Sequence, residues 1–407
     1  MNSHLKLRRL QAVLAVHDHG SALKAADNIH MSQPSVTDAI AACEADIGTA
    51  LFTRTARGMV PTSAGVTFCK RIALAFEHLQ QAETLIRQKR GKATAPLHRL
   101  VSEVQLKALS AVVEAGGFHQ AARRIGLSQP SVHRAARELE TLCGVPLFRR
   151  DGAGVEATAE ARALARFADL CFGELSSGLA EVRELQGVVD GQLAVGALPL
   201  ARSQWLPEAV AATLRDFPLA KVRIMDGPYD EQLRALLHGR IDMILGALRD
   251  PSPTPDITQE AVFSDPVVIV VRADHPFAAG FDSERDKLTA DQLDDLAWVL
   301  PRDGTPGRRN FEAFMRTKGL DSPARVVECS SLVTTRALVL QSDHAALLSR
   351  QQVEAELTQG RLKIMGPPLS GSLRAIGIAT RASFRPTHLQ DRFLRHLRAN
   401  APAALAT

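Results

Sequence analysis

The chain has 407 residues, enough for roughly two to four domains with buried cores. Its hydrophobic content of 45% and charged content of 23% are ordinary for a globular protein and argue against a disordered or membrane-embedded one. The net charge of +5 is unevenly placed: residues 1–170 carry 22 Lys and Arg against 15 Asp and Glu, whereas residues 171–407 carry 27 against 29. A basic excess confined to the N-terminal part is what a surface that contacts nucleic acid would give, but an excess this mild would by itself favour an ordinary solvated surface.

The cysteines and the N-terminal residues indicate the cellular location of the protein and whether disulfides or metal sites are expected. The five cysteines are scattered and none forms a Cys-x-x-Cys pair, so we expect reduced thiols rather than disulfides or a zinc site. Residues 1–20 contain charges and no long apolar stretch, which argues against an export signal or a membrane span. We therefore expect a cytoplasmic protein that contacts no membrane and holds neither a metal nor a cofactor.

The first predicted elements are three helices, a hairpin and a long helix. Apolar residues at helical spacing indicate the helices, and Ser21 and Ser32 are suitable N-caps. In chain order we expect helices over Leu5–His17 and Ala22–Ile29, a third helix after Ser32, a hairpin over Leu51–Pro61, a long helix over Thr62–Arg90 and a linker over Ala93–Pro96.

The same elements occur twice. A shift of 96 residues places Ser32–Val36 on Ser128–Val132 without a gap. The same shift matches Ala25-Ala26 with Ala121-Ala122, Glu44 with Glu140, Gly48 with Gly144, Leu51-Phe52 with Leu147-Phe148, Arg54 with Arg150 and Thr62 with Thr158. The first 160 residues are therefore interpreted as a tandem duplication of one unit.

The stretch Ser128–Arg150 of the second unit has the pattern of a DNA-reading helix followed by a wing. Ser128 is a favourable N-cap, Pro130 fits the first helical turn, and the apolar residues from Val132 onward predict a buried back. A short basic front on such a helix suits the major groove, and arginines on a wing suit phosphate. Beside Ser128 and Pro130, the candidate DNA contacts are Gln129, Ser131, His133, Arg134, Arg137, Arg149 and Arg150.

The first unit is a weaker candidate for reading DNA. The positions that match the basic front are Thr37, Asp38 and Ala41, so an acid replaces an arginine there. We expect the second unit to be the principal reader, with the first unit assisting or serving as an assembly surface. The candidate contacts in the first unit are Ser32, Gln33, Ser35, Thr37, Arg54 and Arg57.

A second long helix is predicted over Ala159–Gln186. Its apolar residues recur at spacings of three and four, as in a coiled-coil seam, although Gly173 and Gly178 weaken the helix. Two partners fit this seam. One is the same helix of a second subunit, and the other is the long helix of the first unit, which would give an intramolecular pseudo-dimer.

From Gly191 onward, short β-rich runs alternate with helices. Strands are expected at Leu193–Gly196, Val222–Met225, Met243–Leu245, Val267–Val271, Trp298–Leu300, Arg325–Val327, Ala345–Leu348 and Ile376–Ala379, with helices at Leu206–Phe217 and Asp230–Gly239. This alternation predicts parallel β-α-β units in two lobes, with the chain crossing between them near Ser264–Val271 and Pro367–Leu373. The predicted fold class is thus α+β and multidomain: two winged helix-turn-helix units with long linker helices, then a two-lobed α/β domain like periplasmic binding proteins.

A ligand is expected between the lobes, at strand ends and helix N-termini. Arginines there would favour a carboxylate or phosphate, and Tyr229 could stack on a sugar. Helix capping is an equally natural role for Ser203, Thr305 and Ser331, and Tyr229 could simply belong to a turn. The candidate ligand contacts are Ala201, Arg202, Ser203, Tyr229, Arg249, Arg302, Thr305, Ser330 and Ser331.

Together these motifs resemble a known family. The residues Ala-Ala, Ser-Gln-Pro-Ser-Val, Leu-Glu-x-x-x-Gly, Leu-Phe-x-Arg and Pro-Thr-x-x-Gly, the last at Pro61–Gly65, resemble LysR-type transcriptional regulators over nearly the whole chain. Gly196–Ser203, Asp226–Tyr229 and Asp242–Arg249 resemble the galactose-binding protein regulator subgroup. The resemblance implies an operator in double-stranded promoter DNA, contact with RNA polymerase, a homodimer or homotetramer, and a small-molecule inducer such as a sugar or an organic acid. Two helix-turn-helix units depart from the family pattern, which has one.

The predicted function is therefore a sequence-specific transcriptional regulator controlled by an effector, and not an enzyme. The alternative is a cytoplasmic ligand-binding adaptor whose winged helices contact proteins. The expected divisions are winged helix-turn-helix units at 1–65 and 99–158, linkers at 66–98 and 159–190, and an effector domain at 191–407, with lobe I formed by 191–265 and 371–407 and lobe II by 266–370.

Overall fold

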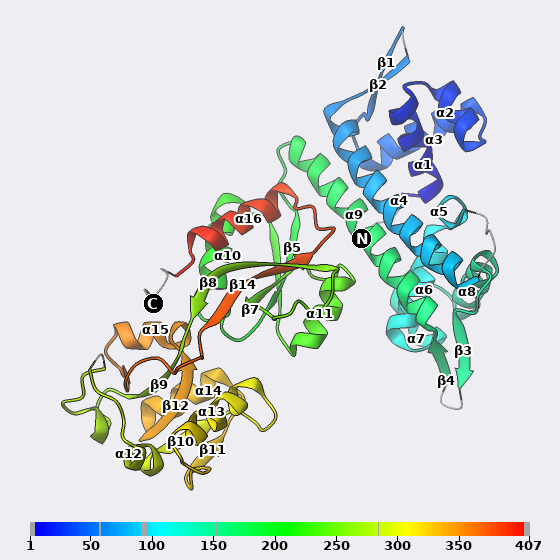
Figure 1. Ribbon diagram of the computed structural model, residues 1–407. Coiled ribbons are helices and arrows are strands. Elements are labelled where there is room, and N and C mark those ends of the chain that lie inside the picture. Colours follow the sequence, from blue (N-terminus) through cyan, green and yellow to red (C-terminus); the bar gives the residue numbers. More distant parts are fainter. Residues whose placement is uncertain (1–4, 57, 91–95, 152–153, 284, 403–407) are drawn as a thin grey trace.

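The structure is a computed structural model that describes residues 5–56, 58–90, 96–151, 154–283 and 285–402 (Figure 1). Its N-terminal part is a helical assembly with two small hairpins, and its C-terminal part contains two five-stranded sheets. None of the described helices is both long and apolar enough to cross a membrane.

The first unit contains the elements expected from the sequence. Ser32 caps the third helix, because its hydroxyl accepts a hydrogen bond from the Ser35 N–H, and Gly48 ends that helix in the left-handed conformation. The elements are α1 (Leu7–His19), α2 (Ala22–Ile29), α3 (Gln33–Ile47), β1 (Phe52–Thr55), β2 (Gly58–Pro61) and α4 (Ser63–Arg90).

The second unit repeats this arrangement after a short helix that the sequence analysis did not predict. Ser128 caps the recognition helix as Ser32 does in the first unit. The elements are α5 (Leu97–Leu100), the helix that was missed, then α6 (Glu103–Ala115), α7 (Phe118–Ile125), α8 (Gln129–Cys143), β3 (Phe148–Asp151), β4 (Gly154–Ala157) and α9 (Ala159–Leu185).

The repeated acids and threonines hold each hairpin to its recognition helix. The Glu44 carboxylate accepts hydrogen bonds from the N–H groups of Leu51 and Phe52, at 2.7 and 3.1 Å. Glu140 accepts the matching pair from Leu147 and Phe148, at 2.9 and 3.0 Å. The hydroxyls of Thr62 and Thr158 likewise donate to carbonyls at the base of their own hairpins. These contacts explain why the same residues recur at a spacing of 96.

The two long helices, α4 and α9, pack against each other in antiparallel orientation, which leaves the two hairpins at opposite ends of the pair (Figure 1). Gly178 permits the approach, because a Cβ atom there would lie 2.8 Å from Arg71 Cβ and 2.9 Å from Phe68 Cδ2. Of the two partners left open for the seam of α9, the structure therefore contains the intramolecular one, and the two units form a pseudo-dimer.

The first sheet of the C-terminal part, here called lobe I, has the strand order β6-β5-β7-β14-β8. Its strands are β5 (Gln192–Ala197), β6 (Lys221–Met225), β7 (Met243–Ala247), β8 (Ile257–Asp265) and β14 (Arg374–Arg381), and its helices are α10 (Trp205–Asp216), α11 (Tyr229–Leu237) and α16 (His388–Ala399). Trp205 packs edge-on against Phe263 in its core, with ring centroids 5.2 Å apart.

The second sheet, lobe II, has the order β11-β10-β12-β9-β13. Its strands are β9 (Val267–Arg272), β10 (Ala297–Leu300), β11 (Val326–Glu328), β12 (His344–Ser349) and β13 (Leu362–Ile364); its helices are α12 (Ala290–Asp295), α13 (Pro306–Thr317), α14 (Leu332–Gln341) and α15 (Arg350–Thr358), with a 3-10 turn at Pro276–Ala278. The chain enters lobe II at Pro266 and returns between Ile364 and Arg374.

The predicted parallel β-α-β units are present, because β5 pairs parallel with β6 and β7, and β10 pairs parallel with β11 and β12. Each sheet also contains antiparallel pairs, which the sequence did not predict. In lobe I, β14 pairs antiparallel with both β7 and β8, and in lobe II, β9 pairs antiparallel with β12 and β13. The reason is topological. Strands β9 and β14 each reach their sheet directly from the other lobe, without the helical crossover that parallel pairing requires. The strands β8 and β13 were also not predicted.

Candidate DNA-binding and effector sites

The front of α8 is basic and exposed. His133, Arg134 and Arg137 all project from the helix on the side away from the buried Val132 and Leu139. The His133 ring lies 5.0 Å from the Phe118 ring, and Arg137 Nη1 lies 2.9 Å from the Glu140 carboxylate. Both contacts orient the basic side chains and leave them in solvent.

The front of α3 has a different chemistry at the same positions. Asp38 and Ala41 are exposed, and the Thr37 hydroxyl donates to the Gln33 carbonyl within the helix, at 3.2 Å. One recognition helix therefore presents cations and hydrogen-bond donors, whereas the other presents a carboxylate acceptor.

The helix-start residues are alike in the two units. The hydroxyls of Ser32 and Ser35 lie 2.8 Å apart, as do those of Ser128 and Ser131, so both cap serines are already engaged within the helix turn. Gln33, Gln129 and Pro130 are exposed beside them. These residues form the N-terminal end of each recognition helix, the part that meets base edges in helix-turn-helix proteins.

Of the four candidate hairpin arginines, two have side chains within the described part of the structure. Arg54 on β1 and Arg149 on β3 are exposed, and Arg149 lies opposite Glu156 in the strand register. Arg57 lies outside the described residues. Arg150 is in β3, but its side chain is also outside the described part.

Lobe I brings together several predicted ligand contacts at the carboxyl ends of β5, β6 and β7. The Arg249 guanidinium lies over the Tyr229 ring, 4.3 Å from its centroid, and Arg202 pairs with Asp226 at 3.2 Å. The Ser203 and Tyr229 hydroxyls are buried and have no hydrogen-bond partner among the described residues. Burial raises the pKa of Tyr229, so its hydroxyl is a protonated donor at neutral pH. Ala201 is buried behind them.

Sequence reasoning missed a cluster beside this site. Arg374, at the start of β14, has a buried Nε atom without a hydrogen-bond partner among the described residues, and its Nη2 lies 3.7 Å from Asp265. Burial lowers the pKa of Arg374, which Asp265 opposes and the neighbouring Arg249 reinforces. Ser349 of lobe II donates to Asp265, whose pKa burial raises. Arg249 and Arg374 carry two positive charges near the single carboxylate of Asp265, so an anionic ligand would balance the second charge.

The predicted contacts in lobe II are explained by helix capping. The Thr305 hydroxyl donates to the Arg302 carbonyl at 2.7 Å and accepts from the Arg308 N–H, and Ser331 accepts from the Thr334 N–H. Arg302 and Ser330 are exposed. None of the predicted ligand contacts lines the cavity of about 490 Å³ in lobe II, which lies between α13 and the returning segment 365–372.

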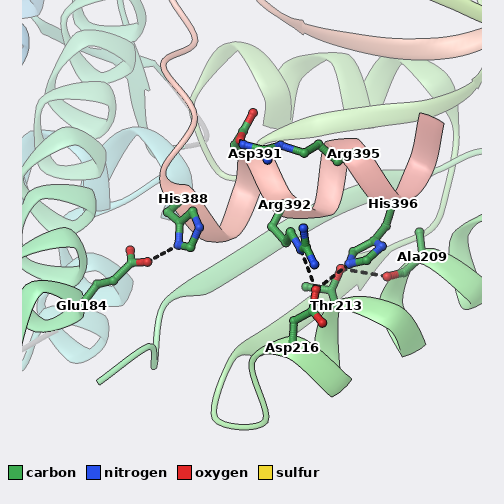
Figure 2. Close-up of polar contacts among 9 residues, drawn as sticks. All are labelled: Glu184, Ala209, Thr213, Asp216, His388, Asp391, Arg392, Arg395 and His396. Carbon is green, nitrogen blue, oxygen red and sulfur yellow. Dashed lines mark hydrogen bonds and ion pairs between the residues drawn. The ribbon is translucent and has the colours of Figure 1, made fainter. Parts of the chain in front are cut away.

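Lobe I is fastened to the long helices. Arg71 of α4 donates to the Arg385 carbonyl at 3.0 Å, and His388 of α16 pairs with Glu184 of α9 (Figure 2). Farther along α16, Arg392 and His396 both contact Asp216 of α10, and Figure 2 shows the three side chains converging. Hydrogen bonds from Arg392 and His396 lower the pKa of Asp216. Helix α16 thus connects the two long helices α4 and α9, here called the linker pair, to α10 of lobe I.

Comparisons with known proteins agree with this architecture. Residues 186–402 match the family model of the LysR substrate binding domain, and residues 7–66 and 104–162 each match that of the bacterial regulatory helix-turn-helix protein, lysR family. The HTH-type transcriptional regulator GalR of Pseudomonas putida is 32% identical over 376 residues, which cover 92% of each chain.

Two solved structures have a similar fold. A full-length OxyR variant from Pseudomonas aeruginosa has a TM-score of 0.51 at 23% identity, covering 73% of this chain and 93% of that one. Full-length LysG of Corynebacterium glutamicum, with bound effector Arg, has a TM-score of 0.50 at 15% identity, covering 73% and 97%. With both helix-turn-helix units and the effector domain matched, the chain belongs to the LysR family of transcriptional regulators.

Proposed function

We propose that the chain binds promoter DNA chiefly through the basic front of α8, with α3 on the same duplex. The observation that carries this proposal is the set of exposed cations, His133, Arg134 and Arg137, on a helix whose other face is buried. Arginine pairs bidentately with guanine, and the adjoining hairpin supplies phosphate contacts through Arg149.

The test is binding to the DNA upstream of the protein's own coding region. We expect Arg134→Ala/Arg137→Ala to weaken binding at least tenfold and Arg54→Ala to weaken it less. The matched control is Arg215→Ala/Arg316→Ala, which removes two exposed arginines from the lobes. Affinity should fall steeply with salt, because phosphate contacts release counterions. Salt-insensitive binding, or equal effects of the two double variants, would instead favour the adaptor that contacts proteins.

The effector site supports an organic acid that carries hydroxyl groups, bound at the strand ends of lobe I. Arg249 and Arg374 supply the charge that a carboxylate needs. The hydroxyls of Ser203 and Tyr229, which have no partner in the described part of the chain, supply hydrogen bonds. A neutral sugar, the alternative, would leave two neighbouring arginines without an anion. A thermal-shift panel of hydroxylated aromatic acids, sugar acids and neutral sugars separates these classes. Arg374→Met should abolish the shift of an acid, and a sugar that shifts both proteins equally would contradict the proposal.

The chain is proposed to have no catalytic activity and to act in the cytoplasm. The curated relatives are transcriptional regulators, and the hydroxyls of Thr305 and Ser331 are engaged in helix caps rather than free to act as nucleophiles. The domain divisions given from the sequence are kept in this proposal. Turnover of a candidate acid that disappears in Ser203→Ala would overturn the first statement.

A further inference from the structure

The linker pair is not symmetric, although the two units that it joins are repeats. The shift of 96 residues carries Arg71 of α4 to Phe167 of α9, and it carries Glu174 and Glu181 of α9 back to His78 and Leu85 of α4. On one side of the pair, Arg71 binds both carboxylates, with Nη1 2.8 Å from Glu174 and Nε 2.9 Å from Glu181. The pseudo-twofold relation places apolar Phe167 opposite His78 and Leu85 on the other side.

This asymmetry makes α4 and α9 specific for each other. If two chains paired α4 with α4, each buried Arg71 would face His78 and Leu85 and have no carboxylate. If they paired α9 with α9, Phe167 would face Glu174 and Glu181, leaving acids without their cation. Arg71 is 5% exposed, and the side chains of Glu174 and Glu181 are 14% and 19% exposed, so the first arrangement would bury an unpaired cation and the second would partly bury unpaired carboxylates. The internal pairing is the one that satisfies every partner.

The two recognition helices joined by this pair, α3 and α8, also differ in the side chains that they expose. At three matched positions, α8 presents His133, Arg134 and Arg137, and α3 presents Thr37, Asp38 and Ala41. Arginine recognises guanine through two acceptors, whereas a carboxylate accepts from the amino group of cytosine. The two recognition helices therefore favour different bases, and neither can replace the other.

We infer that a single chain reads an asymmetric operator, a duplex with two unlike half-sites, in one fixed direction. This inference rests on the proposed function and names its DNA partner. An ordinary dimer of identical units reads an inverted repeat, because the symmetry of the protein is mirrored in the DNA. Here the covalent pair replaces the dimer, and lobe I attaches to it on one side only, through contacts that include Arg71 with the Arg385 carbonyl and Glu184 with His388.

The test is selection of bound sequences from random duplex DNA with the full-length chain. The wild type should select two unlike half-sites, at a ratio of one chain per pair of half-sites by mass measurement of the complex. His133→Thr/Arg134→Asp/Arg137→Ala, which gives α8 the front of α3, should convert the selected site into an inverted repeat of the first-unit half-site.

The reciprocal variant is the matched control. Thr37→His/Asp38→Arg/Ala41→Arg should select an inverted repeat of the other half-site. Each variant should also bind the wild-type operator roughly 5- to 150-fold more weakly, the range expected for one lost bidentate base contact. A wild-type site that is itself an inverted repeat, or two chains bound to one pair of half-sites, would overturn the inference and leave DNA binding intact. Absence of any selected DNA would instead refute the proposed function.

Discussion

Arg71 is the residue whose loss should most weaken the linker pair. Its side chain is 6% exposed, and it binds Glu174, Glu181 and the Arg385 carbonyl. Burial alone would lower the pKa of Arg71, but its hydrogen bonds to Glu181 and Glu174 outweigh burial and raise it. The guanidinium therefore stays charged, and Arg71→Met leaves two partly buried carboxylates without their cation.

The cost follows from the exposure of those partners. Removing one member of a buried ion pair costs about 3–5 kcal/mol. Because the side chains of Glu174 and Glu181 remain 14% and 19% exposed, we take the lower end, about 3 kcal/mol. For a unit of this size, each kcal/mol shifts Tm by roughly 2–4 °C, so we expect the helical transition to fall by about 6–12 °C.

Two spectroscopic probes separate this effect from damage elsewhere. The two tryptophans, Trp205 and Trp298, lie in lobes I and II, so their fluorescence follows the effector domain, whereas the circular dichroism at 222 nm also follows the long helices. Arg71→Met should lower the circular dichroism transition and leave the fluorescence transition in place. Adding Glu174→Gln/Glu181→Gln should restore most of the loss. A triple variant that melts below Arg71→Met would refute the reasoning.

Three further predictions concern other parts of the chain. Glu140→Ala removes the acceptor for two hairpin N–H groups, so we expect hydrogen exchange to speed up in residues 147–157 and not in 51–61, with the reverse result for Glu44→Ala. With a thiol reagent at pH 8, Cys329 should react fast and the buried cysteines slowly, because burial raises the pKa of Cys43, Cys69 and Cys171 to about 12; a fast phase that survives in Cys329→Ser would contradict this. Burial, with help from Arg381 and Arg166, lowers the pKa of His78 below its ordinary 6.5, so below that pH the unfolded chain binds a proton that the folded chain does not. Stability should therefore fall between pH 6.5 and 5.5, by at most about 1.4 kcal/mol from this group, and His78→Leu should remove that part of the fall.

The sequence was most informative where contacts are local or repeated. Cap serines and helical spacing located α3 and α8, and the shift of 96 residues exposed the duplication. It was least informative for β8, whose run Ile257–Asp265 alternates poorly because a bulge against β14 shifts the register between Ala261 and Phe263. The partner of α9 stayed open for a related reason: a seam of apolar and small residues fits a second copy as well as α4.

The residues that decide these questions are distant in sequence. Arg71 meets Glu174 and Glu181 across more than one hundred positions, and Arg374 meets Asp265 across a whole lobe. A lone arginine among 49 cationic residues carries no sign of its partner. Likewise, nothing local shows that the Thr305 hydroxyl caps its helix whereas the Ser203 hydroxyl has no hydrogen-bond partner within the described ranges, because both residues precede a helix.

The locked linker pair also limits how an effector can reach the DNA. Sliding α4 along α9 would break the buried contacts of Arg71, so we expect an effector bound in lobe I to act on the DNA-binding units through the exposed rim of that lobe. There Arg240, just after α11, lies 3.1 Å from Glu114 at the end of α6, and Glu114 also binds Arg124 of α7 at 2.9 Å. These contacts connect lobe I to α6 and α7 of the second unit, and α7 packs against the recognition helix α8.

Arg240→Ala is therefore expected to uncouple the effector from the second reader. Pairs this exposed contribute only about 0.2–1 kcal/mol, so the variant should fold and bind DNA without effector to within about fivefold of the wild type. The acid identified by the thermal-shift panel should change the affinity of the wild type for a duplex whose first half-site is altered. In Arg240→Ala this acid-induced change should be smaller, because the effector signal is expected to reach the DNA through the second unit. The control is Arg398→Ala, which breaks a similarly exposed pair with Glu260 within lobe I and away from the ligand contacts. If Arg240→Ala responds to the acid as fully as the wild type, the coupling runs through α16 and Glu184 instead, at the other end of the linker pair.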